Sequence, residues 1–291
     1  MWKRILSICL LLCIAIILFL KHGAIDKIDT SEDIQSKGNK EESSELEQKV
    51  LTFSIDGRSP KGAKQWHLEG KSAEIVGEEI YLNDLGAVAY GENTVVILTS
   101  EKGIYRKDKG EVELMGNVKV NSDDGLMLTT EKAKWSQNTR EISTDEIVHI
   151  SRDKVMAVGK GGMANSDNMS AMLKEDVTVT MEPDTKVTCD GPLEMDYNGH
   201  VAVFKNNVRV EDKDGSLFSD MLTVEFDPDT GKFTRVIAEG NVKTKKGRSY
   251  TLSEKAIYTE STKSAKLLGR PRIIIDPQEI EKLEGFREES G

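Results

Sequence analysis

The residues that could support catalysis or metal binding are few and far apart in this chain of 291 residues. Its four histidines are His22, His67, His149 and His200, and their spacings are not those of metal ligands. Neither a Gly-x-Ser-x-Gly elbow nor a Cys–His arrangement typical of nucleophilic catalysis stands out. We therefore expect that the protein is not an enzyme and that it uses neither a metal ion nor another cofactor.

Several acidic and glycine-rich stretches need a closer look, because paired carboxylates can serve acid–base catalysis or bind calcium. DDG at 123–125 and DKDG at 212–215 both lie between two apolar runs, where Asp-Gly favours a hairpin turn. DPDTGKF at 227–233 is also typical of a turn and lacks EF-hand spacing. GKGG at 159–162 lacks the remainder of a phosphate-binding loop. All four are interpreted as structural.

The surrounding segments favour β-structure. From Val50 to Asp276, apolar residues alternate in short runs such as VVILT at 95–99, and helical periodicity is nearly absent. The first valine of each run recurs at intervals of 29 to 34 residues, at Val88, Val118, Val148, Val177, Val208 and Val242. A second run recurs with the same spacing, as LTSEKGIY at 98–105 and LTTEKAKW at 128–135. A period near 30 is typical of a stacked repeat.

Each repeat should contribute about two strands to a two-walled structure with an apolar interior, with Gly, Asn and Asp clusters separating the runs. On pattern alone, a parallel β-helix, a β-sandwich and an elongated jelly roll all remain possible. In NVKV, alternation places Val118 and Val120 on one face and Lys119 on the other.

The same alternation gives twelve candidate interior residues: Val118, Val120, Leu126, Leu128, Trp135, Ile142, Val148, Ile150, Val177, Val179, Val208 and Val210. Core packing without any ligand is the alternative role for each of them.

The N-terminus has the pattern of a membrane anchor. Lys3 and Arg4 precede an apolar run from Ile5 to Leu20, which is slightly shorter than the roughly 20 residues of a spanning helix. No Ala-x-Ala-type cleavage site follows, so an uncleaved anchor at 1–22 is favoured over a signal peptide. By the positive-inside rule, the rest of the chain lies on the outer side of the membrane.

Charge and cysteine content narrow the possible partners. The net charge is −10 and no basic stripe occurs, so we do not expect nucleic-acid binding. Cys9 and Cys13 fall in the expected anchor, which leaves Cys189 without a partner for an internal disulfide. Cys189 should therefore be a buried, apolar residue.

Some of these stretches resemble a known family. Phe53-x-Ile55 with Gly57, followed by KGAKQWHLEGKSAEI at 61–75, resembles the opening of the LptC family of the lipopolysaccharide export system. The sequence at 103–120, GIYRKDKGEVELMGNVKV, resembles that family's body. FKNNVRVEDKDG at 204–215 and IAEGNVKTKKG at 237–247 resemble the related LptA/OstA repeats.

The resemblance implies an all-β fold, an elongated, open and twisted β-jelly roll after one N-terminal transmembrane helix. The expected divisions are an anchor at 1–22, a tether at 23–49, an LptC-like jelly-roll domain at 50–182, OstA/LptA-like repeats at 183–276 and a polar tail at 277–291. An LptC-like part would end near residue 182, so this chain resembles a longer or fused form.

The implied function is lipopolysaccharide transport by a single-pass inner-membrane protein whose C-terminal part is periplasmic. Its partners would be lipopolysaccharide, the permease subunits of an inner-membrane ABC transporter and a periplasmic LptA-like bridge protein, joined by β-strand addition. The twelve candidate residues would then line a trough for acyl chains.

One alternative is an exported scaffold whose interior is filled by side chains. Another is a carbohydrate-processing β-helix enzyme, which would need a carboxylate cluster on one outer face.

Overall fold

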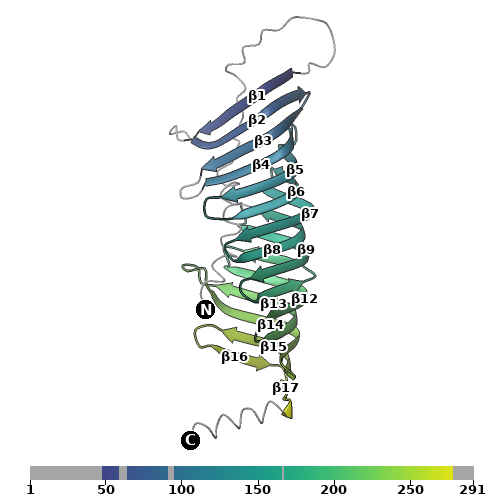
Figure 1. The fold of residues 1–291 in the computed structure, drawn as a ribbon, viewed down its shortest axis with the longest axis vertical. Coiled ribbons are helices and arrows are strands. Elements are labelled where there is room, and N and C mark those ends of the chain that lie inside the picture. Colours follow the sequence, from purple (N-terminus) through teal and green to yellow (C-terminus); the bar gives the residue numbers. More distant parts are fainter. Residues whose placement is uncertain (1–47, 59–63, 91–94, 166, 278–291) are drawn as a thin grey trace, which may run out of the picture. The chain divides into compact units, whose positions relative to one another are not determined.

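The computed structural model describes residues 48–58, 64–90, 95–165 and 167–277. This part of the chain is all-β, with seventeen strands (Figure 1). The expected anchor, almost all of the expected tether and almost all of the polar tail lie outside the described residues. Within the described residues, no helix has the length and apolar character needed to span a membrane.

The strands belong to two compact units. Among the described residues, the first unit comprises those at 48–150 and 162–169, and the second comprises those at 151–161 and 170–277. The first unit contains β1 (Gln48–Arg58), β2 (Lys64–Val76), β3 (Glu79–Tyr90), β4 (Val95–Arg106), β5 (Glu111–Ser122), β6 (Met127–Ser136) and nearly all of β7 (Glu141–Arg152). Strand β8 (Val155–Asn165) contributes residues to both units. The second contains β9 (Ser170–Met181), β10 (Thr185–Cys189), β11 (Leu193–Asp196), β12 (Val201–Asp212), β13 (Gly215–Phe226), β14 (Phe233–Lys246), β15 (Ser249–Thr259), β16 (Ser264–Leu268) and β17 (Arg272–Ile274).

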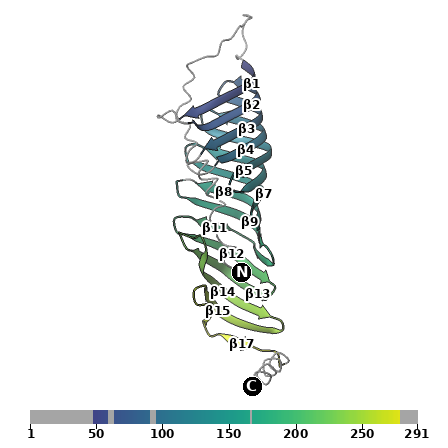
Figure 2. The same cartoon turned by 60° about the vertical axis from the view of Figure 1, so that its left-hand side comes forward.

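Within each unit, neighbouring strands pair antiparallel. In the first, each of β1 to β5 pairs with the next strand in the sequence, and Figure 2 shows these five as successive arrows. In the second, β10 and β11 lie end to end between β9 and β12, and β12 to β15 then pair in order. Strand β15 also pairs with β16 and β17. Antiparallel pairing within both units excludes the parallel β-helix.

Three long strands, β5, β12 and β14, contain a bulge near their midpoint, which we call the corner. In β9 the left-handed residue Asp176 takes the equivalent place. In β5 the pair Gly116-Asn117 opposes the single residue Glu131 of β6, because the register shifts between Met115 and Val118. Both residues of the pair have left-handed backbone angles, with φ of 77° at Gly116 and 46° at Asn117. Glycine and asparagine tolerate this conformation better than other residues, and a bulge bends the strand that carries it.

The same corner recurs in the second unit. Asn206-Asn207 of β12 opposes Asp220 of β13, and Gly240-Asn241 of β14 opposes Glu254 of β15. All four residues of these two pairs have positive φ. The corner therefore explains the period of the sequence, since the Gly-Asn or Asn-Asn pair comes directly before the recurring valine.

A carboxylate accepts a hydrogen bond from the asparagine at the second position of each corner pair. The side-chain amide of Asn117 donates to Glu101 of β4, and that of Asn241 donates to Asp220 across 2.8 Å. Asn207 donates in the same way to Asp190. Hydrogen bonds of this kind fix the corner of one strand against the corner of the next.

The structure corrects two details of the sequence interpretation. The Gly-Asn and Asn-Asn pairs do not separate strands, because the runs at 201–204 and 207–210 are the two halves of β12. The recurring position in β3 is Leu85 rather than Val88, since Leu85 follows the left-handed residue Asp84 and is buried, whereas Val88 is half-buried. The Asp-Gly stretches at 123–125 and 212–215 are turns, as expected.

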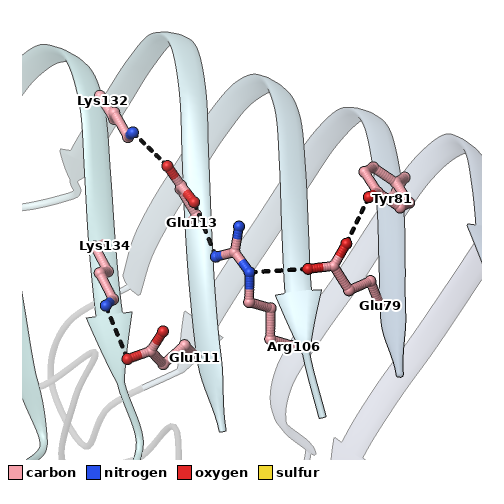
Figure 3. A network of polar contacts seen from close by, with 7 residues as sticks. All are labelled: Glu79, Tyr81, Arg106, Glu111, Glu113, Lys132 and Lys134. Atoms are coloured by element: carbon pink, nitrogen blue, oxygen red, sulfur yellow. Dashed lines mark hydrogen bonds and ion pairs between the residues drawn. The ribbon is translucent and has the colours of Figure 1, made fainter. Parts of the chain in front are cut away.

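A charged network crosses the outer face of the first unit (Figure 3). Arg106 of β4 donates from Nε to Glu79 of β3 at 3.0 Å and from Nη1 to Glu113 of β5 at 2.9 Å. The Tyr81 hydroxyl donates to Glu79 at 2.5 Å, and Lys132 of β6 pairs with Glu113. The network links four consecutive strands. Lys132 and then Arg106 hold the pKa of the Glu113 carboxyl below its ordinary value.

The corner geometry predicts that Gly116→Ala destabilises the protein more than Gly125→Ala. Both glycines have positive φ, which costs an alanine about 1 kcal/mol. A Cβ at Gly116 would also lie 2.6 Å from Glu101 Oε2, whereas a Cβ at Gly125 meets nothing within 4 Å. We expect losses of about 2 kcal/mol or more for Gly116→Ala and about 1 kcal/mol for Gly125→Ala in urea unfolding. Equal losses would contradict the proposed close approach at the corner.

The network predicts an acid-sensitive contribution to stability. Because the folded-state pKa of Glu113 is lowered, its contribution is complete at neutral pH and is lost as the pH falls through the ordinary value of 4.5 toward the folded-state pKa. Glu113→Gln should cost about 1 kcal/mol at pH 7 and less in acid, as measured by urea unfolding at both pH values.

Glu111→Gln is the matched control, because Glu111 lies on the same strand and, among the described residues, pairs with Lys134 alone, at 2.8 Å. It should cost less than Glu113→Gln at neutral pH. A Glu113→Gln loss that is the same in acid as at pH 7 would show that the carboxylate charge is not what stabilises these strands.

Candidate functional site

Two rows of residues define the inner face of the first unit, and each takes one residue from every strand from β1 to β6. In register, the row on one side of the corner is Val50, Ala73, Leu82, Gly103, Leu114 and Ala133. The row on the other side is Ile55, Leu68, Ala87, Leu98, Val120 and Leu128. Opposed residues of antiparallel strands share a face, so the two rows form two continuous apolar walls.

The second unit repeats this arrangement. One wall carries Leu173, Leu193, Phe204, Leu222, Ala238, Ala256 and Leu267 in register. The other carries Val179, Val187, Val210, Leu217, Thr244, Thr251 and Ile273. The second wall becomes polar near its end, where the hydroxyls of Thr244 and Thr251 satisfy each other at 2.6 Å.

The structure places the predicted interior residues of β5, β6, β9 and β12 on these inner faces. Val118 and Val120 are buried while Lys119 between them is exposed, as the alternation predicts. Among the twelve candidates, the buried ones are Val118, Val120, Leu126, Val148, Val177, Val179 and Val208. The half-buried ones are Leu128, Trp135, Ile142, Ile150 and Val210. Their contact with a lipid remains a prediction.

Burial is greatest directly after the corner, where Val118, Val177, Val208 and Val242 are each only 1% exposed. In β12 burial then decreases, since Val210 two residues further along is half-buried. The first unit differs, because Val96 and Leu126 near the end of the equivalent wall are 1% and 0% exposed. The corner is therefore the floor of the interior, and the accessibility of the walls differs from strand to strand.

Hydroxyl groups at the floor were not found by sequence reasoning. Ser100 and Thr130 are buried, and each donates to the carbonyl two residues ahead, at 3.2 and 3.5 Å. The hydroxyls of Ser219 and Ser253 occupy the same register position and have no hydrogen-bond partner. The signal was the Ser or Thr that precedes Glu or Asp in the second run of each repeat, as in TSEK and TTEK.

Cys189 takes the place of the hydroxyl residue in its repeat. It lies opposite Val177, as Thr130 lies opposite Val118. The side chain is buried, as predicted, and burial raises the pKa of its thiol. Cys189 is therefore a small core residue and not a reactive thiolate.

Sequence reasoning also missed the inner row on the N-terminal side of the corner. Leu114, Phe204 and Ala238 are buried, and each lies two residues before a corner pair. Leu173 is buried three residues before the left-handed Asp176. An apolar residue at this nearly fixed offset was the available signal.

Among the described residues, no cluster of three or more histidine, cysteine or acidic side chains is placed to bind a metal ion.

Comparison with known proteins places the chain among lipopolysaccharide transport proteins. Residues 7–182 match the family described as "Lipopolysaccharide-assembly, LptC-related", and residues 191–285 match the family "LptA/(LptD N-terminal domain) LPS transport protein". No curated protein matches the chain at a significant level.

Among solved structures, the chain is similar to LptH, the LptA-homologous periplasmic component of the lipopolysaccharide transport device of Pseudomonas aeruginosa. The TM-score is 0.35 and the sequence identity is 16%, over 42% of this chain and 95% of that one. The first family match alone covers more than half of the chain. The chain belongs to the LptC-related family of lipopolysaccharide-assembly proteins.

Proposed function

We propose that the protein carries lipopolysaccharide from the inner toward the outer membrane, with its acyl chains held on the inner faces described above. The observation that carries this proposal is the pair of apolar rows in each unit, which continue from strand to strand in register. An acyl chain lying along such a row would meet mainly apolar side chains, up to the polar pair Thr244 and Thr251 in the second unit. Polar sugars and phosphates would remain where the walls are accessible.

The energetics favour an apolar path. Transfer of one methylene group from water is worth about 0.8 kcal/mol, so a chain of about twelve carbons gains up to roughly 10 kcal/mol. Residues directly after successive corners are equally buried, as Val177, Val208 and Val242 show in the second unit. Sites of equal depth suit transport, because a lipid passes between neighbouring sites without being trapped at one of them.

Acyl chains would reach the interior at the half-buried inner positions. Val208 at the floor is fully buried, whereas Val210 on the same strand is half-buried. Leu128 and Ile150 of the first unit are also half-buried. These positions support an open jelly roll, in which the walls admit acyl chains while the headgroup remains in water.

The bitopic role combines this interior with the N-terminal apolar run, Ile5 to Leu20. That run would anchor the protein in the inner membrane, with residues 50–276 in the periplasm. Among the described strands, β1 pairs only with β2, so it offers a free edge to the permease subunits of the transporter. The edge formed by β16 and β17 would receive a periplasmic LptA-like bridge protein by strand addition.

A structural scaffold is the competing function, because a tightly packed interior would also bury these valines. The two functions differ in what the inner residues contact. In a lipid carrier, acyl chains contact the inner residues and not the outer ones. In a scaffold, acyl chains contact residues of neither face.

Site-specific photo-crosslinking tests the proposed function with adjacent positions on opposite faces. A photoreactive residue replaces Leu128, which is half-buried on the inner face, or Met127, which is 52% exposed on the outer face. In cells that export lipopolysaccharide, the probe at 128 should form a lipopolysaccharide adduct. The probe at 127 should form at least about tenfold less of this adduct, because alternation turns the side chain at 127 away from the interior.

Val210 and Arg209 repeat the comparison in the second unit, since Val210 lies in an inner row and Arg209 is exposed. Labelling at 210 but not at 209 would extend the path into that unit. Absence of adducts from both inner positions, in protein that remains folded, would favour the scaffold.

A further inference from the structure

The outer face of the second unit carries an unusual set of cations. Opposite the inner row that contains Val210, register places Thr188, Arg209, Phe218, Lys243, Leu252 and Arg272 in one outer row. The next outer row contains Lys186, Glu211, Ser216, Lys245, Tyr250 and Ile274. These two rows, which we call the basic face, hold five cations and one anion in a chain whose net charge is −10.

The fold does not require this charge. The equivalent outer rows of the first unit contain two acidic residues, Asp56 and Glu69, and a single lysine, Lys119. Lys119 occupies in GNVKV the position that Lys243 occupies in GNVKT. The excess of cations is therefore a property of the second unit's sequence.

Most of these cations have no counter-charge among the described residues. Lys186, Lys243, Lys245 and Arg272 make no ion pair there, and only Arg209 is bonded to Glu211. Lys246 at the end of β14 is also exposed. Lysines elsewhere on the outer faces, such as Lys132 and Lys255, have acidic partners.

Aromatic side chains lie among the cations. The Arg209 guanidinium is 5.3 Å from the centroid of the Phe218 ring, and the Lys243 ammonium is 5.1 Å from that of Tyr250. Leu252 is half-buried between the strands and Ile274 is 37% exposed. Long cationic side chains mixed with aromatic and aliphatic ones are typical of surfaces that lie at the headgroup level of a bilayer.

We propose that the basic face binds the surface of a bilayer containing anionic phospholipids. The ammonium and guanidinium groups would contact lipid phosphates, while Phe218 and Tyr250 would lie at the level of the headgroups. The cations extend over the six strands from β10 to β17, about 24 Å at roughly 4.8 Å per strand. Mobile lipid phosphates can match cations spread over this distance, whereas a protein partner would need carboxylates at fixed spacings.

A fluorescent reporter on the basic face tests this proposal without relying on lipopolysaccharide. Ser216→Cys, labelled with a polarity-sensitive dye in a chain carrying Cys9→Ser and Cys13→Ser, reports directly from the face, since Cys189 is buried. The full chain in phosphatidylcholine nanodiscs is titrated with vesicles of phosphatidylcholine, with or without phosphatidylglycerol. We expect a blue shift only with the anionic vesicles, and its reversal at high salt.

Matched lysine variants test which cations act. Lys243→Gln should weaken vesicle binding about fivefold, and Lys243→Gln with Lys245→Gln about 30-fold, because each cation near an anionic surface contributes about 1 kcal/mol. Lys119→Gln, at the equivalent position of the first unit, should leave binding unchanged. The proposal is overturned if anionic vesicles cause no shift, if neutral vesicles cause the same shift, or if the double variant binds like the parent. A shift with a polyglutamate peptide but none with anionic vesicles would overturn it in favour of an acidic protein partner.

Discussion

The left-handed corners of β5, β12 and β14 give the two-walled interior its shape. Two left-handed residues opposite one carboxylate bend β5, β12 and β14 at equivalent places. Because a valine directly follows the corner pair in each of these strands, that valine always lies at the floor of the interior. Without the corner, alternation alone would give a sheet with one apolar face and no interior.

Two kinds of polar contact hold this geometry, and both leave the inner rows apolar. Asparagine-to-carboxylate bonds fix neighbouring corners, as at Asn241 and Asp220. Cross-strand ion pairs such as that of Arg106 with Glu113 act on the outer face (Figure 3). The charged groups are thereby confined to one side of each wall. In a lipid carrier this separation matters, because a charge on the inner face would interrupt the apolar path and raise the cost of moving an acyl chain past it.

Local patterns in the sequence predicted much of the fold but not its long-range parts. Alternation in NVKV gave the correct faces of Val118 and Val120, and Asp-Gly gave the turn at 123–125. Gly116-Asn117 was interpreted as a boundary, since a left-handed pair inside a strand has the same composition as a turn. The inner rows and the basic face could not be predicted, because they depend on register between strands. Lys243 and Arg209 become neighbours of Phe218 only through that pairing.

Methyl NMR of the valine-labelled full chain can detect acyl chains on the inner faces. With lipopolysaccharide bearing protonated acyl chains in an otherwise deuterated sample, we expect intermolecular NOEs to methyl groups of inner-row residues such as Val120 and Val210. Val88, on the outer face, should show none. NOEs at Val88 alone, or none at any valine despite saturating lipopolysaccharide, would show that the acyl chains do not lie on the inner faces.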